Sequence, residues 1–204
     1  MPRLALLLLL VWFLTLFVFR TILQWRRTGS GGFKGFSGRV GSLEWGAGVL
    51  ITLGLAAIAL APVASLRGWP GGSLLLAQPA LHLFGAGLAA AGMLATLAAQ
   101  LDMGDSWRVG VDASERTALV TGGLFARVRN PIFSFMLLST LGFVLLLPNA
   151  LSLLALVLAV VGIEVHVRAV EEPYLLRTHG PSYAAYAARV GRFLPGVGLL
   201  RRDA

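Results

Sequence analysis

Apolar residues gather along the chain into five long runs, separated by segments rich in arginine, glycine and proline. A helix crosses a hydrocarbon layer of about 30 Å with roughly 20 apolar residues, and with somewhat fewer where flanking side chains reach the interface. The pattern therefore predicts an all-α integral membrane protein. Its five transmembrane helices are expected at residues 4–19, 43–64, 79–99, 132–147 and 149–170.

The connections between these runs limit how they pair. Only Pro148 and Asn149 separate the fourth and fifth runs, which is a turn signal without room for a loop, so a tight antiparallel hairpin is expected. The first run also has the length of a signal peptide. It lacks a small-residue cleavage site and is followed by Arg20, Arg26 and Arg27 at a membrane edge, so we interpret it as a transmembrane helix.

Composition supports the membrane class and excludes some kinds of site. Of the 204 residues, 57% are hydrophobic and 13% charged, and the mean hydropathy is +0.80. The absence of cysteine excludes disulfides and thiolate metal sites, and the three histidines are too scattered to indicate a metal site. A net charge of +8 suggests nucleic acid as a partner in a soluble protein; here it follows from topology, and no nucleic-acid partner is expected.

Basic residues are distributed unequally between alternate connections. One side of the membrane carries only Arg3 and Arg67. The positive-inside rule therefore places the N-terminus outside and the C-terminal tail in the cytoplasm, in a multi-pass protein of the plasma (inner) membrane with an odd number of spans. The fifteen basic residues of the cytoplasmic side are Arg20, Arg26, Arg27, Lys34, Arg39, Arg108, Arg116, Arg127, Arg129, Arg168, Arg177, Arg189, Arg192, Arg201 and Arg202.

Glycine and alanine mark two segments. The third helix carries a small-xxx-small series that suits close helix packing, either within the chain or in a dimer, so the oligomeric state stays open. Its GAG stretch at 85–87 lies inside a span without a preceding strand, which disfavours a nucleotide loop. The glycine-rich segment 29–41 is expected to be a flexible cytoplasmic linker whose phenylalanines touch lipid. The series is Gly85, Gly87, Ala91 and Ala95.

Two cytoplasmic regions hold the candidate chemistry: an elbow at residues 100–131 and the segment from residue 168 onward. A carboxylate inside a span tends to mark function, which makes Glu164 a candidate. Alternatively, Glu164 pairs with Arg168, and Arg168 with Glu172, as ordinary neighbours four residues apart on a helix. Both interpretations remain open at this point.

Further along, Pro173 interrupts the helix and suits the first position of a new one, and Gly180 with Pro181 ends that helix. Glu171 and Glu172 are therefore expected to face a common polar cavity under the elbow. A second short amphipathic helix follows, with Tyr183, Tyr186 and Val190 on one side. The alternative interpretation is that this helix is only an interfacial anchor of aromatic and basic residues.

Three blocks of the chain, over residues 100–195, resemble the isoprenylcysteine carboxyl methyltransferase family. The segments Met103-Gly104 with Trp107, and Leu119 to Phe133, are similar to its LGxxW and LVTxGPYxxVRHPxY elements. The ending resembles its EExxLxxxxGxxYxxYxxxVxRxxP pattern, at Glu171, Glu172, Leu175, Gly180, Tyr183, Tyr186, Val190, Arg192 and Pro195.

The resemblance implies an integral membrane methyltransferase that uses S-adenosylmethionine, within the group that includes phospholipid methyltransferases. It implies a methyltransferase core at 100–204, after the three membrane helices that the apolar runs predict at 1–99, and a lipid-like acceptor that enters from the bilayer. Arg129, Glu172 and Glu164 are the expected catalytic residues. The expected cofactor-binding residues are Val128, Arg129, Asn130, Pro131, Glu171, Glu172, Tyr183 and Tyr186.

Within these roles, Glu171 or Glu172 suits the cofactor's ammonium or ribose diol, and Arg129 suits its carboxylate. Tyr183 or Tyr186 suits the adenine. A carboxylate acceptor needs no general base, whereas an alcohol or amine does; Glu164, Glu172 and His179 are the candidates. As an alternative, His179 is a surface histidine near a helix end.

The chain departs from the family at three positions: Asn130 replaces the usual His, Phe133 replaces Tyr, and Phe135 stands where Gly is frequent. Asn cannot carry a proton near neutral pH, which disfavours a mechanism with a histidine base there. Two alternatives follow. Membrane sterol reductases, which bind a nicotinamide cofactor, have a similar final segment, and a non-catalytic relative would also tolerate Asn130.

Overall fold

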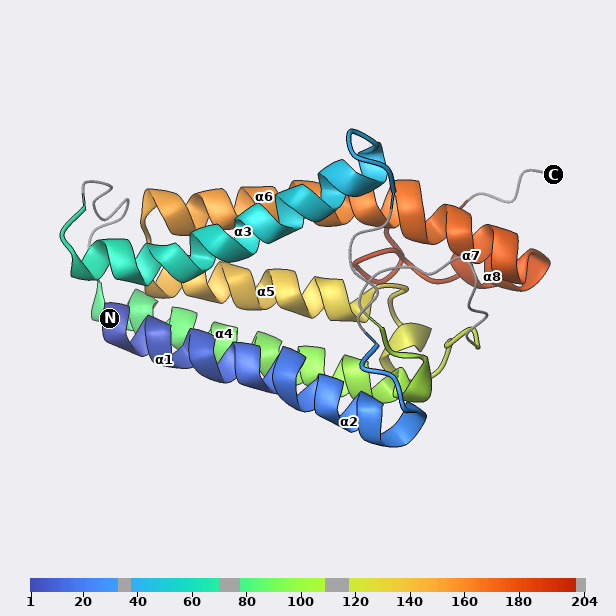
Figure 1. The fold of residues 1–204 in the computed structure, drawn as a ribbon, viewed down its shortest axis with the longest axis horizontal. Helices are drawn as coiled ribbons and strands as arrows, with labels where there is room; N and C mark the ends of the chain where they lie inside the picture. Colours follow the sequence, from blue (N-terminus) through green and yellow to red (C-terminus); the bar gives the residue numbers. More distant parts are fainter. Residues whose placement is uncertain (33–37, 70–77, 109–117, 201–204) are drawn as a thin grey trace.

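A computed structural model describes residues 1–32, 38–69, 78–108 and 118–200, and regular structure in this part of the chain is helical. Long helices lie side by side, with Met1 at one end of the bundle and the C-terminal helices at the other (Figure 1). They are α1 (Pro2–Phe13), η1 (Leu14–Phe19), α2 (Arg20–Thr28), α3 (Leu43–Leu66), α4 (Pro79–Asp102), α5 (Pro131–Leu146) and α6 (Ala150–His166).

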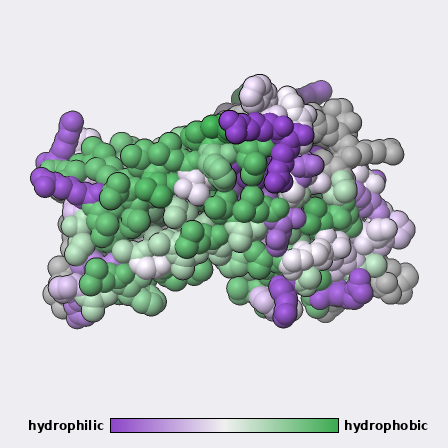
Figure 2. Space-filling model, turned by 90° about the horizontal axis from the view of Figure 1, so that it is seen from below, coloured by the Kyte–Doolittle hydropathy of each residue, from purple (hydrophilic) through white to green (hydrophobic). Residues whose placement is uncertain are grey.

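The bundle is a multi-pass membrane domain. Four continuous helices are long and apolar enough to cross a membrane: Pro2–Thr28, Leu43–Leu66, Pro79–Asp102 and Ala150–His179. The fifth, α5, is apolar but has 16 residues, which at 1.5 Å per residue gives about 24 Å. The predicted five-helix arrangement is confirmed as four full-length spans and one shorter helix. Figure 2 shows hydrophobic residues over the middle of one face and hydrophilic ones toward its ends.

The first helix is longer than predicted. Its expected end at Phe19 is wrong, because the helix continues through a π-helical turn and Arg20 to Thr28. Arg20 is fully buried and donates to Gln24 Oε1 at 3.0 Å and to the Gly104 carbonyl at 2.6 Å. Its guanidinium lies 4.6 Å from the ring centroid of Trp107. These contacts replace water around the charge, so the arginine does not end the helix.

Helices α4 and α5 pack at very short range. A methyl group added to Gly92 would lie 2.5 Å from the backbone nitrogen of Ser139, and one added to Gly85 would overlap the backbone at Leu146. Close helix packing through small residues is confirmed, but the predicted series is wrong except at Gly85. Around Gly87 a methyl group would meet nothing within 4 Å. The contact face instead follows Gly85, Ala89, Gly92 and Thr96.

The turn between α5 and α6 is as short as predicted. Asn149 caps α6 by accepting from the Ser152 backbone N–H at 2.8 Å, and the Ser152 hydroxyl accepts from the Asn149 backbone N–H. The Asn149 side chain also donates to Ala61 O and Ser65 Oγ in α3. The hairpin arms make their most extensive contacts outside the hairpin, α5 with α4 and α6 with α3.

At the opposite end, α6 continues through the π-helical turn η4 (Val167–Glu171) into α7 (Glu172–His179), and α8 (Pro181–Ala187) follows. Pro173 lies in the first turn of α7, and Gly180, at φ 49°, ends it, as predicted. The elbow contains two single turns, η2 (Gly104–Ser106) and η3 (Gly123–Ala126). Residues 33–37 of the predicted linker and 109–117 of the predicted elbow lie outside the described residues.

Candidate functional site

A buried carboxylate between two arginines lies at the centre of the predicted site. Glu172 Oε1 accepts from Arg129 Nη2 at 2.6 Å and from Arg192 Nε at 2.8 Å. Arg192 Nη2 completes a bidentate pair with Oε2 at 2.9 Å. The Glu172 side chain is 7% exposed and that of Arg129 is 1% exposed. The hydrogen bond to Glu172 raises the pKa of Arg192 above its usual value.

Arg129 joins this carboxylate to the C-terminal tail. Its Nη1 donates to the carbonyls of Ala187, at 3.0 Å, and Val190, and its Nη2 donates to Gly198 O at 3.0 Å. Its Nε is buried and has no hydrogen-bond partner among the described residues. Most donors of the Arg129 guanidinium therefore bind groups of the protein itself, and the bidentate pair with Glu172 is made by Arg192.

The segment from Arg127 to Pro131, with the sequence RVRNP, is held by backbone hydrogen bonds to the same tail. Val128 and Gly191 form an isolated parallel bridge, and Arg129 N donates to Gly191 O at 2.8 Å. Asn130 donates twice to Arg192 O, from its backbone N and from Nδ2, both at 3.1 Å. Pro131 then begins α5 at a position where no backbone N–H is needed. Two segments about 60 residues apart in the sequence thus form one unit.

The two tyrosines of α8 face inward rather than toward a membrane surface. Tyr183 is 2% exposed and Tyr186 6%, and their ring centroids are 6.1 Å apart. The Tyr186 hydroxyl donates to Phe125 O in the elbow at 2.6 Å. Burial raises the pKa of Tyr186 to about 12, and burial together with the negative charge of Glu172 raises the pKa of Tyr183. Helix α8 ends at Ala187 and is therefore shorter than predicted. Val190 lies beyond its end but still packs against the two tyrosines.

The adjacent acids take different partners. Glu171 Oε1 lies 3.4 Å from His166 Nε2, and its side chain is 26% exposed. The His166 ring in turn meets Phe133 edge-on, with centroids 6.0 Å apart. The expectation that Glu171 and Glu172 face a common cavity is wrong, because Glu171 contacts His166 while Glu172 binds Arg129 and Arg192. Sequence reasoning missed His166, because residues five apart share a side only in a π-helical turn, and that turn left no sequence signal.

Glu164 and Arg168 form the predicted pair, with Arg168 Nε donating to Glu164 Oε2 at 2.5 Å. Their side chains are 39% and 60% exposed, which makes this a surface ion pair. The predicted pairing of Arg168 with Glu172 is wrong, because both oxygens of Glu172 are bonded to Arg129 and Arg192.

A second missed residue, Asp102, connects the bundle to the elbow. Its Oδ2 accepts from the Leu124 backbone N–H at 2.8 Å, and a methyl group added to Gly123 would overlap its carboxylate. Asp102 ends α4, just before the Met103-Gly104 motif, so its position was the available signal. This bond ties the backbone at Leu124 to the end of α4, while Arg20 ties the backbone at Gly104 to α2.

Residues 80–182, half of the chain, match the sequence pattern of the phospholipid methyltransferase family. No curated protein matches the chain. The matched range begins at the start of α4 and ends in α8, so it includes Arg129 and the Glu171–Glu172 pair but not Arg192. The family indicates a membrane methyltransferase, in agreement with the resemblance noted in the sequence. The chain belongs to the phospholipid methyltransferase family.

Proposed function

We propose that this protein transfers a methyl group from cytosolic S-adenosylmethionine to a lipid-like or isoprenoid acceptor at the inner face of the plasma membrane. The acceptor atom is a carboxylate oxygen or another oxygen or nitrogen nucleophile, and S-adenosylhomocysteine is the second product. The N-terminus lies outside and α7 and α8 lie in the cytoplasm. The supporting observation is that both sequence blocks of a methyltransferase family meet at the Arg129–Glu172 pair, at one end of an apolar bundle.

The residues at this end fit the cofactor's charges. A sulfonium and an ammonium favour nearby carboxylates, and Glu171 is the more accessible acid, with 26% of its side chain exposed against 7% for Glu172. Arg129 retains a buried, unpartnered Nε among the described residues. We assign Glu171 to the cofactor's ammonium, Tyr183 and Tyr186 to the adenine side, and the Arg129–Glu172–Arg192 cluster to holding the surrounding backbone in place.

When bound, S-adenosylmethionine supplies a methyl group on a sulfonium, which an acceptor lone pair takes by in-line displacement as the carbon–sulfur bond breaks. The chain's contribution is alignment, which can supply on the order of 7–11 kcal/mol of the barrier. The RVRNP turn fixes the start of α5, where the cytoplasmic end meets the bilayer. A low-dielectric wall also assists, because anion and sulfonium neutralise each other in the transition state.

An acceptor with a proton requires a base, and three residues are candidates. Glu164 is half-exposed and carries Arg168 as its partner. His179 has a buried Nε2 without a partner among the described residues, at the end of α7. Glu172 is the weaker candidate because two guanidinium groups stabilise its anion.

Calorimetric titration of the detergent-purified protein with S-adenosylhomocysteine, with NADPH in parallel, tests the proposal. Saturable binding of S-adenosylhomocysteine alone supports it, and Glu171→Gln should then weaken binding about tenfold or more, since charge-assisted contacts are worth roughly 1.5–3 kcal/mol. Arg67→Gln, at the end of α3 that lies away from the ion cluster, is the control and should leave the affinity unchanged. Binding of NADPH alone would replace the proposal with a reductase. Binding without methyl transfer to any extracted lipid would indicate a non-catalytic relative.

A further inference from the structure

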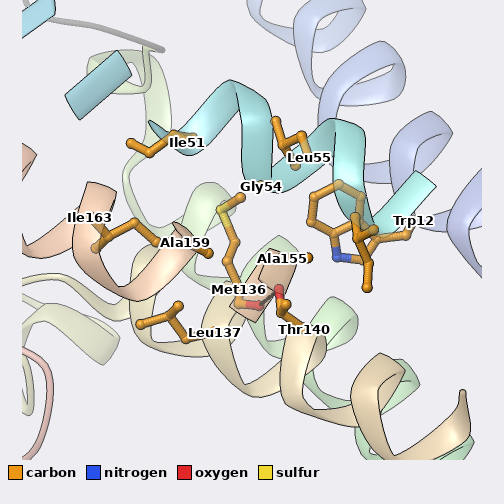
Figure 3. A pocket seen from close by; sticks show the side chains of 11 residues that line it. Trp12, Ile51, Gly54, Leu55, Met136, Leu137, Thr140, Ala155, Ala159 and Ile163 are labelled. Carbon is orange, nitrogen blue, oxygen red and sulfur yellow. Dashed lines mark hydrogen bonds between the residues drawn. The ribbon is translucent and has the colours of Figure 1, made fainter. Parts of the chain in front are cut away.

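A lipid-facing groove lies between α1, α3, α5 and α6, away from the polar cluster. It encloses about 30 Å³ in this structure. Its walls are almost entirely apolar, and Figure 3 shows side chains from the four helices converging on it. Leu55, at its edge, is 37% exposed on the outer surface of the bundle, where lipid chains lie. The groove therefore borders the bilayer, and apolar chains are its natural surroundings.

One polar hydrogen in this groove lacks an acceptor. Trp12 is 6% exposed, and its indole Nε1 is buried without a hydrogen-bond partner among the described residues. A buried N–H without an acceptor is unfavourable, and buried Trp usually finds one. Thr140 lies at the same end of the groove as Trp12 and Ala155 (Figure 3), and its hydroxyl donates to Met136 O at 2.9 Å within α5, but it does not accept a hydrogen bond from the Trp12 indole. The groove thus presents a donor within an apolar wall.

The depth of Trp12 limits what can supply the acceptor. Trp12 precedes Arg20 by eight residues of one helix, which places it about 12 Å above the polar end at 1.5 Å per residue. Hydrocarbon about 30 Å thick has its midplane near that depth. Ester groups of ordinary membrane lipids lie at the interface, so an oxygen at this level must belong to the interior of a long chain. A lone water is disfavoured because it needs two to four polar partners.

We propose that the groove binds the hydrocarbon tail of the methyl acceptor, and that this tail carries an ester or ketone carbonyl about 12 Å from its reacting end, which accepts the Trp12 Nε1–H. The inference rests on the proposed function for the identity of the ligand as acceptor. The groove widens by movement of Met136 and Leu55, since methionine changes rotamer readily and Leu55 faces the bilayer. Specificity arises because a chain without the oxygen leaves the indole unpaired.

Nuclear magnetic resonance of the protein labelled with nitrogen-15 tryptophan, in detergent micelles, tests the contact. Two probes of equal chain length are titrated: octyl octanoate, with an ester in mid-chain, and heptadecane, without oxygen. The Trp12 signal is identified by its loss in Trp12→Phe. We expect octyl octanoate alone to shift the Trp12 indole proton downfield in a saturable manner, and to bind about threefold to tenfold more tightly than heptadecane, as one hydrogen bond allows.

In Trp12→Phe the preference for the ester should fall to about one, whereas Trp25→Phe, an exposed site on the same continuous helix, should keep it. Equal binding of both probes, no binding of the ester, or an indole proton already shifted downfield without ligand would each overturn the proposal. S-Adenosylhomocysteine affinity, measured on the same Trp12→Phe sample, should be unchanged. If the wild type did not bind S-adenosylhomocysteine, the proposed function would be contradicted, but the comparison of the two probes would still test the Trp12 contact.

Discussion

Arg192 grips both carboxylate oxygens of Glu172 in a bidentate pair, at 2.8 and 2.9 Å, across 20 residues of chain. Arg129, from the RVRNP turn, binds the same carboxylate from a segment 43 residues away. The ion cluster therefore unites the start of α5, the base of α7 and the C-terminal tail. A cluster with this much burial is sensitive to the loss of any one charge.

Glu172→Gln should strongly destabilise the protein, because it leaves two buried guanidinium groups without a counter-charge. Removing one partner of a buried pair typically costs about 3–5 kcal/mol. Thermal unfolding in detergent, followed by circular dichroism, measures the loss. Glu164→Gln, in the exposed pair with Arg168, serves as the control and should cost less than about 1 kcal/mol. Similar melting temperatures for the two variants would contradict the buried cluster.

Asn130→His should fold and melt near the wild type, because an imidazole N–H can replace the amide donor to Arg192 O. Asn130→Ala removes that bond and should lower the free energy of unfolding by about 1 kcal/mol. Denaturant titration of both variants makes the comparison. A histidine variant less stable than the alanine variant would show that the turn has no room for a ring.

Gly92→Ala should destabilise the bundle by about 1–3 kcal/mol, since the new methyl group meets the α5 backbone at Ser139 and overpacking forces the helices apart. Gly87→Ala, five residues earlier in the same helix, meets nothing within 4 Å and should be neutral or slightly stabilising. Unfolding in a denaturing detergent series distinguishes them. If both variants behaved alike, the α4–α5 contact would be looser than described.

Tyr186→Phe should lower the free energy of unfolding by about 0.5–1.5 kcal/mol through loss of the bond to Phe125 O. The folded pKa of Tyr186, about 12, exceeds the ordinary value near 10. Its contribution to stability is therefore complete below pH of about 10 and is lost as pH rises through 12. Ultraviolet titration of tyrosinate in the wild type and the variant checks this; an ordinary titration midpoint for the missing component would refute it.

The helical architecture could be predicted from the sequence because the apolar runs have, or in the case of α5 nearly have, the length that a membrane demands. The end of the first helix could not, since the charge of Arg20 is stabilised by carbonyls and a ring that belong to the elbow, far away in the sequence. The contact face of α4 was also predicted wrongly. Gly85 belongs both to the predicted series and to the observed series of small residues, and only the position of α5 distinguishes the two.

For the site, the sequence indicated which residues belong together but not how they pair. Arg129 and Glu172 lie in two recognisable blocks, and their contact follows from the fold that brings the blocks together. The partner of Glu171 depends on a π-helical turn that moves His166 onto its side of the helix. The roles of Glu164, Tyr183 and Tyr186 toward a cofactor remain predictions, as does the division of the chain at residue 100.

The dependence of the ion cluster on Arg192 has a consequence for biosynthesis. Synthesis proceeds from the N-terminus, so every membrane helix and α7 leave the ribosome before Arg192 does. Until then, Glu172 and Arg129 lack the bidentate partner and the tail carbonyls that enclose them in the finished protein. The bundle can be inserted as a lipid-embedded intermediate, but the end that carries the ion cluster closes only after Arg192 has been synthesised. A nascent chain stalled before that point would be a membrane protein without a completed site.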